Sequence, residues 1–200
     1  MLKEASPDYV IHELLAKRWS PYGFQSRSVA ADDLRSLFEA ARWSASSFNE
    51  QPWRFIVATQ ADAAEFEKML SCLAEPNQVW AKVAPVLALG VAKLDFSQNG
   101  KPNRVAIYDL GAAACSLTFE ATARGLMVHQ MAGILPDKAR ELYQVPEGFD
   151  VITALAIGYA ADPESLSDRL KERDQKPRQR KPLSEFVFDG EWGTASAVIS

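Results

Sequence analysis

The sequence predicts a single α+β domain in which a mixed sheet is flanked by helices around one long buried helix. The chain has 200 residues and is 48% hydrophobic, which is enough for one full-sized core. Short runs rich in β-branched and aromatic residues alternate with segments of helical periodicity. One helical segment is apolar on every face, so we expect the fold to bury it on all sides.

Helices and strands alternate in the N-terminal half. We expect helices at 8–16, 31–43 and 61–73 and strands at 53–58 and 84–91. In the second helix, Leu34, Leu37 and Phe38 begin an apolar repeat at helical spacing. Asp32 and Asp33 suit the positive end of that helix's dipole.

The longest predicted helix covers residues 103–124 and carries no charge between Asp109 and Glu120. In a chain this short, a partner subunit is one way to cover all faces of such a helix. The helix is therefore the first indication of an interlocked homodimer. The segment 126–131, a short helix at 136–143 and a strand at 151–159 complete the core.

Residues 162–200 form a C-terminal extension of a domain that spans residues 1–200. The extension is charged and contains prolines as far as a basic run at 176–181, which is typical of a solvated surface. Apolar side chains then follow, among them Leu183, Phe186 and Trp192, and they are too many to be left in water. We expect this extension to pack on the partner subunit.

Charge and composition exclude several function classes. The formal net charge of -4 provides no basic field for nucleic acid, and no apolar run approaches the ~20 residues of a membrane span. The N-terminus carries acids and a proline where a secretory signal needs a basic start and an apolar stretch, so we expect a cytoplasmic protein.

Few side chains can supply acid, base or metal chemistry. Cys72 and Cys115 each lie in an apolar helical pattern, and we expect both to be reduced residues of the core. His12 and His129 are the only histidines, which excludes a His-rich metal site and leaves little room for a Ser-His-Asp hydrolase. An enzyme of this composition is expected to take its reactivity from a cofactor.

Three motifs could bind such a cofactor. The loop at 43–55 combines small hydroxyl and amide side chains with a Pro-Trp wall, which suits a planar heteroaromatic ligand but also suits a plain helix exit. Arg18-Trp19-Ser20 offers a guanidinium and a hydroxyl to a phosphate, and Arg178-Gln179-Arg180 could bind the same phosphate. Taken alone, each arginine is equally consistent with a solvated surface.

Together these motifs resemble the FMN-dependent nitroreductase family. The resemblance spans nearly the whole chain, in order and at the family's spacing. It is carried by Arg18-Trp19-Ser20, the loop from Ala41 to Trp53, Gly125-Leu126 leading into 129–133, and the basic run that ends in Pro182-Leu183. It implies a nitroreductase-like mixed sheet in an interlocked homodimer with FMN at the interface.

The resemblance also implies which residues hold the flavin. They are Arg18, Trp19, Ser20, Tyr22, Ala45, Ser46, Asn49, Asn77, Ala132, Gly133, Arg178 and Arg180. The phosphate and ribityl end of FMN would be held by Arg18, Ser20, Arg178 and Arg180. Ser46 and Asn49, with the backbone of Ala45, would come from the other subunit. Asn77 would bond the ring, and the backbone N–H groups of Ala132 and Gly133 would face N5 and O4.

The chain departs from the family pattern at two positions. Ser44-Ala45-Ser46 replaces the usual Ala-Pro-Ser, so the loop loses a stiffening proline. Tyr22 stands where the family commonly has Lys or Arg, which removes a cation from the side of the flavin where negative charge accumulates, unless Tyr22 simply packs beside Phe24 as a pocket wall. His129 has apolar neighbours, and we interpret it as structural rather than as a general acid.

The implied activity is transfer of electrons from NADH or NADPH through FMN to a nitroaromatic, a quinone or a similar acceptor. No G-x-G-x-x-G follows a strand, so the nicotinamide is expected to use the open flavin face and leave before the acceptor enters, giving ping-pong kinetics. No side-chain acid or base is required. Two alternatives remain open at this point, namely a non-catalytic module that binds or handles flavin and a structural dimer without a ligand.

Overall fold

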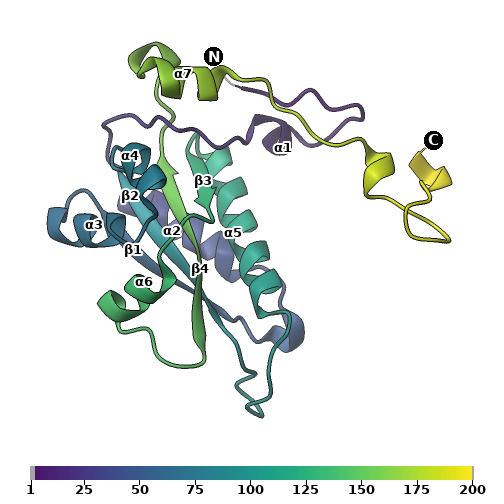
Figure 1. Ribbon diagram of the computed structural model, residues 1–200, viewed down its shortest axis with the longest axis horizontal. Helices are drawn as coiled ribbons and strands as arrows, with labels where there is room; N and C mark the ends of the chain where they lie inside the picture. The colour runs from purple at the N-terminus through teal and green to yellow at the C-terminus, as the bar shows by residue number, and fades with distance from the viewer. Residues whose placement is uncertain (1–2, 200) are drawn as a thin grey trace.

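Four strands form an antiparallel sheet in the order β1-β2-β4-β3 (Figure 1). The computed structural model describes residues 3–199. The strands are β1 (Trp53–Thr59), β2 (Val86–Lys93), β3 (Met127–Met131) and β4 (Phe149–Gly158). The helices are α1 (Glu13–Lys17), α2 (Ala31–Arg42), α3 (Ala63–Leu70), α4 (Glu75–Ala81), α5 (Ala106–Ala123), α6 (Pro136–Tyr143) and α7 (Asp168–Gln175). A short 3-10 turn, η1 (Ser47–Asn49), lies between α2 and β1.

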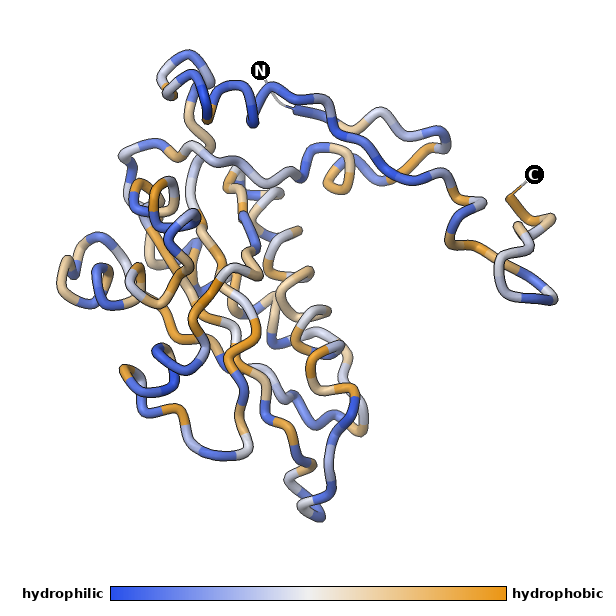
Figure 2. The backbone as a smooth tube through the Cα atoms, viewed as in Figure 1, coloured by the Kyte–Doolittle hydropathy of each residue, from blue (hydrophilic) through white to orange (hydrophobic). Residues whose placement is uncertain are grey.

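Helices cover both faces of the sheet. Along β2, Leu87 and Leu89 belong to a core with α3, α4 and α6, whereas Val86 and Ala88 belong to a second core with α2 and α5. This alternation follows from the two-residue period of a strand. Figure 1 shows the two helical layers on opposite sides of the sheet, and Figure 2 shows hydrophobic residues concentrated along the strands between them.

The α+β class is confirmed, but the expectation of a mixed sheet is wrong for the described strands. All three strand pairs are antiparallel. Strands buried on both faces, such as β2, are typical of sheets that contain parallel strands. Here β2 is buried because helices cover both faces of the sheet, so its burial does not indicate the direction of the neighbouring strands.

Helix α5 is covered by its own chain on one face only. Ala113, Leu117 and Ala121 are fully buried against the sheet. On the opposite side Ile107 is 51% exposed and Tyr108 is 78% exposed. The expectation of burial on all sides is therefore not met within one chain. No helix in residues 3–199, α5 included, has both the length and the hydropathy needed to cross a bilayer.

The two cysteines lie in different environments. Cys72 is buried, as expected, whereas Cys115 is exposed on α5, so its assignment to the core is wrong for a single chain. The reason is geometric, because both cysteines sit in apolar sequence but Cys115 falls on the face of α5 that the chain leaves uncovered.

The two ends of the chain run beside each other above the sheet (Figure 1). Helix α1 begins at Glu13 rather than at the expected Asp8 and has no buried residue. Nη1 of Arg178 donates to the carbonyls of Ala16 at 2.6 Å and Lys3 at 3.2 Å. Beyond this point the C-terminal segment leaves the body of the fold, with Trp192 93% exposed.

We expect Leu117→Ala to destabilise the fold by roughly 2–5 kcal/mol, because Leu117 is fully buried between α5 and the sheet and its loss leaves a cavity. Urea unfolding at matched protein concentration measures the change. Leu142→Ala on α6, where the side chain is 37% exposed, is the control and should cost much less. Equal losses for the two variants would show that α5 is not part of the core.

Candidate functional site

Three guanidinium groups gather where the two ends of the chain meet. Arg18 follows α1, and Arg178 and Arg180 follow α7. Burial lowers the pKa of Arg18, and the nearby charge of Arg180 lowers it further. The pKa of Arg178 is lowered by burial and then by Arg18 and Arg180. The sequence motifs from opposite ends of the chain thus form one cationic cluster, defined here as the arginine cluster.

The arginine cluster has no counter-charge of its own. Among residues 3–199, none of its three members forms an ion pair with a carboxylate. Arg18 donates from Nη1 to the hydroxyl of Ser20 at 3.3 Å. The neighbouring Trp19 is only 5% exposed, and its Nε1–H has no hydrogen-bond partner. Cations that repel one another and have no carboxylate partner form an arrangement that a phosphate would satisfy.

Asp174 of α7 fixes the segment that follows Ser20. Its carboxylate accepts hydrogen bonds from the backbone N–H of Tyr22 at 2.9 Å and of Gly23 at 3.3 Å. Burial raises the pKa of Asp174, while these two backbone donors oppose that shift. The contact holds α7 over the N-terminal segment and so places residues from both ends of the chain around one site.

An aromatic cluster lies beneath α7. The ring of Tyr22 makes edge contacts with Trp80 at 5.2 Å and with His129 at 4.8 Å between centroids. Trp80 and His129 lie 4.4 Å apart, with their planes tilted by 32°. Nδ1 of His129 lies 2.8 Å from the carbonyl of Pro21, so this nitrogen carries the proton and donates it. Burial lowers the pKa of His129, which fits the structural role expected for it.

A cation lies beside Tyr22, although residue 22 itself supplies none. Cζ of Arg173 lies 4.9 Å from the centroid of the Tyr22 ring. The cation comes from α7, far along the chain, rather than from residue 22 itself. Tyr22 packs on Trp80 and His129, and both interpretations of its role beside a bound flavin stay predictions.

Asn77 and Gly133 join α4 to the loop that follows β3. Nδ2 of Asn77 donates to the carbonyl of Gly133 at 2.9 Å, and its Oδ1 accepts from Nε1 of Trp80 at 3.3 Å. A Cβ at position 133 would lie 2.6 Å from Asn77 Nδ2, so a larger residue there would displace the Asn77 side chain from this hydrogen bond. Within residues 3–199 the backbone N–H groups of Ala132 and Gly133 donate to no protein acceptor, so both remain available to a ligand.

The loop between α2 and β1 has a strained backbone. Phe48, Asn49 and Gln51 all adopt positive φ, between 51° and 55°. Non-glycine residues rarely adopt this conformation, and such strain clusters at functional sites. The hydroxyl of Ser46 accepts from the N–H of Gln51 at 3.0 Å.

This loop is fastened to α5, away from the arginine cluster. The N–H of Ser47 donates to Asp109 at 3.1 Å, in the first turn of α5, whereas Figure 1 shows α1 near the opposite end of that helix. Ala45, Ser46 and Asn49 are therefore not brought to Arg18 within one chain. Their assignment to a second subunit stays a prediction.

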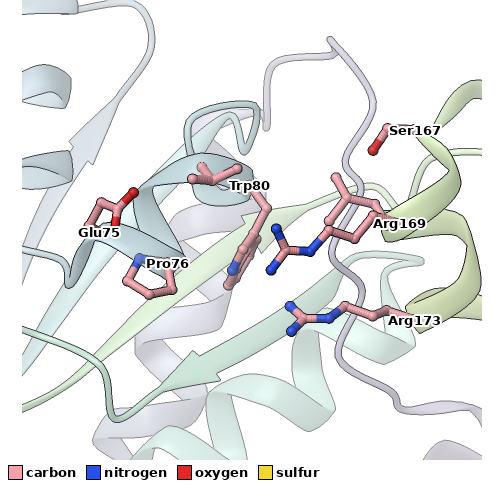
Figure 3. Close-up of a pocket in the computed structure, with 8 residues that line it drawn as sticks. Glu75, Pro76, Trp80, Ser167, Arg169 and Arg173 are labelled. Carbon is pink, nitrogen blue, oxygen red and sulfur yellow. The ribbon is translucent and has the colours of Figure 1, made fainter.

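Sequence reasoning missed the contribution of α7. Residues 162–180 look like a solvated surface, yet α7 turns Arg169 and Arg173 toward Trp80 (Figure 3). The available signal is the spacing of the two arginines, because residues four apart share one face of a helix. Nothing in the sequence alone shows that this face meets α4.

Comparisons with known proteins agree on one family. The model of the Nitroreductase family matches residues 15–159. An uncharacterised 15.4 kDa protein of Mycolicibacterium smegmatis is 35% identical over 147 residues, covering 70% of this chain and 97% of the relative. The major NAD(P)H-flavin oxidoreductase of Aliivibrio fischeri is 27% identical over 219 residues, covering 89% of this chain and 97% of the relative.

Solved structures give the same result. A crystal structure of an oxidoreductase containing FMN is 34% identical, with a TM-score of 0.88, and the match covers 94% of this chain and 96% of that one. An FMN-dependent nitroreductase from Clostridium difficile R20291 is 21% identical, with a TM-score of 0.68, and covers 89% of this chain and 98% of that one. At that identity the second match concerns the fold alone.

We expect inorganic phosphate to stabilise this protein through the arginine cluster. A ligand present at ten times its Kd adds about 1.4 kcal/mol to the free energy of unfolding. Thermal unfolding in phosphate is compared with unfolding in chloride at equal ionic strength, on protein stripped of any bound small molecule. Arg18→Ala should lose most of the stabilisation. Arg35→Ala, which removes an exposed arginine paired with Asp32, should retain it. An unchanged response in Arg18→Ala would refute the phosphate assignment.

Proposed function

Because this chain belongs to the nitroreductase family, we propose that it is an FMN-dependent oxidoreductase that uses NADH or NADPH to reduce a small organic acceptor. Acceptors of the expected class are nitroaromatics, quinones and similar flat molecules. The names of two relatives support the assignment, one being an NAD(P)H-flavin oxidoreductase and the other an oxidoreductase containing FMN.

The observation that carries the proposal is the arginine cluster. Arg18, Arg178 and Arg180 come together, and none of them pairs with a carboxylate of residues 3–199. A bound phosphate would offset the mutual repulsion of the guanidinium groups and accept several charge-assisted hydrogen bonds. The residues present therefore fit the phosphate end of FMN.

The ring end of the flavin fits the loop after β3. The free N–H groups of Ala132 and Gly133 would donate to the ring, and Asn77 holds this loop against α4. When bound, FMN supplies the electron chemistry, accepting hydride from the nicotinamide and passing electrons to the acceptor. The chain's own residues orient the ring and supply backbone donors. His129 bonds to the carbonyl of Pro21, burial lowers its pKa, and the proposed chemistry does not need it as an acid.

We further propose a homodimer that completes the site. The uncovered face of α5 is apolar, with Ile107, Tyr108 and Cys115 exposed. The strained loop with Ser46 and Asn49 is fastened to the same helix, so a partner packed on α5 would carry its own loop toward this chain's arginine cluster. The C-terminal extension leaves the body of its own chain and would pack on the partner.

The order of binding follows from the lack of a separate nicotinamide site. No dinucleotide-binding glycine motif follows any strand of this chain. Donor and acceptor would therefore use the same opening in turn, which gives ping-pong kinetics with parallel double-reciprocal plots.

We expect the purified protein to be yellow, or to become yellow with added FMN, and to bleach when NADH or NADPH is added without oxygen. An acceptor such as a quinone should then restore the absorbance. Visible spectra in a sealed cuvette record each step. Protein that binds FMN but is not reduced by either nucleotide would be a flavin-handling module instead. Protein that takes up no FMN would overturn the proposal altogether.

We expect Gly111→Glu to give a monomer that has lost most of its FMN. A Cβ at position 111 meets nothing within 4 Å in its own chain, so the substitution leaves the fold intact and places a charge on the uncovered face of α5. Gly111→Ala is the matched control and should stay dimeric. Sedimentation velocity and flavin absorbance are measured together. A dimeric Gly111→Glu protein would show that another surface forms the interface, and a monomer that keeps its FMN would show that one chain completes the site.

A further inference from the structure

A pocket of about 340 Å³ lies between α4 and α7, outside the arginine cluster. Its walls include Glu75, Pro76, Val79 and Trp80 from α4 and Arg169 and Arg173 from α7. Figure 3 shows both guanidinium groups extending from α7 toward Trp80. The family resemblance assigns no role to either arginine.

The two arginines of this pocket form no ion pair with a carboxylate of residues 3–199, although a neighbouring cation of α7 does. Lys171 pairs with Glu164 across the turn before the helix. Within residues 3–199, neither Arg169 nor Arg173 forms an ion pair, and their spacing of four residues places like charges on one face of α7. Glu75 also lines the pocket but bonds to neither of them. An anion bound between the arginines would remove their repulsion.

The remainder of the pocket is apolar and small. Pro76, Val79, Leu170 and Trp80 supply aliphatic and aromatic surface opposite the arginines. Ligand pockets usually measure about 300–1,000 Å³, so 340 Å³ lies at the lower end of that range. The pocket suits a single-ring compound rather than a whole dinucleotide.

The pocket adjoins the expected position of the flavin ring. Trp80 donates to Asn77, which in turn bonds to Gly133. Arg173 lies over Tyr22, which contacts the same Trp80. A ligand in the pocket would therefore lie next to the loop that carries the free N–H groups.

We propose that this pocket binds the electron acceptor and selects one that carries a carboxylate on an aromatic ring, with Arg169 and Arg173 binding the carboxylate. The ligand's role as electron acceptor rests on the proposed function. Its binding does not, since binding of an aromatic acid can be measured without turnover. The arginines act here as specificity-determining residues.

The test compares two probes of nearly equal shape and different charge. Isothermal titration calorimetry measures binding of para-nitrobenzoate and of neutral para-nitrobenzamide to the oxidised, FMN-loaded protein. We expect the parent protein to bind the acid more tightly than the amide. Arg173→Gln and Arg169→Gln should each weaken binding of the acid by about 10- to 100-fold and leave binding of the amide unchanged. Lys171→Gln, which removes a cation of α7 that is paired with Glu164, is the control and should bind both probes as the parent does.

Equal affinity for the acid and the amide in the parent protein would overturn the inference. Loss of FMN from both arginine variants would also overturn it, because the arginines would then belong to the flavin site. The phosphate of the donor is another source of an anion, and a rise in KM for NADPH but not for NADH, with para-nitrobenzoate binding unchanged, would assign the arginines to that phosphate. Preference for the acid in a protein that NAD(P)H cannot reduce would support the pocket and contradict the proposed function alone.

Discussion

The structure depends on an electrostatic conflict that the chain cannot resolve by itself. Arg18 and Arg178 are partly buried close to the exposed Arg180, and no carboxylate among residues 3–199 pairs with any of the three. The repulsion between the guanidinium groups is only partly offset by hydrogen bonds to neutral groups, since Arg178 donates to the carbonyls of Ala16 and Lys3. Clustered cations without a counter-charge destabilise the folded protein, and such a loss of stability is typical of a site that binds an anion. The same meeting of the two chain ends places α7, through Asp174, over the aromatic cluster of Tyr22, Trp80 and His129.

Helix α5 presents the complementary problem. One of its faces packs on the sheet and forms the core, while the other, which carries Ile107, Tyr108 and Cys115, is uncovered in its own chain. The strained loop from η1 is fastened to this helix through Asp109. A single association along α5 would therefore bury the apolar face and complete a shared site in one step. In this account, cofactor binding and dimerisation are linked because the same helix supports both.

The sequence predicted those parts of this structure that the local pattern of apolar and polar residues determines. Helix α6 was expected at 136–143 and is found there, and α2 and β1 match within a residue. Motif order also indicated that Arg18 and Arg180 would meet, although they are 162 positions apart in the sequence. What failed depends on tertiary contacts. Apolar spacing alone predicted a helix from Asp8, and apolar context alone placed Cys115 in the core. The cation beside Tyr22 comes from Arg173, which no local pattern connects to residue 22.

The central claim is that the arginine cluster binds the phosphate of FMN, and comparison with riboflavin, which has the same ring and no phosphate, tests it most directly. Flavin fluorescence quenching gives the Kd of each ligand for the stripped parent protein and for Arg18→Ala. The account predicts that FMN binds the parent at least about 100-fold more tightly than riboflavin, since two charge-assisted bonds or more are at stake. It also predicts that Arg18→Ala weakens the binding of FMN and leaves the Kd for riboflavin unchanged. Equal affinities of the parent for the two flavins would contradict the account, because the cluster would then have no part in holding the cofactor.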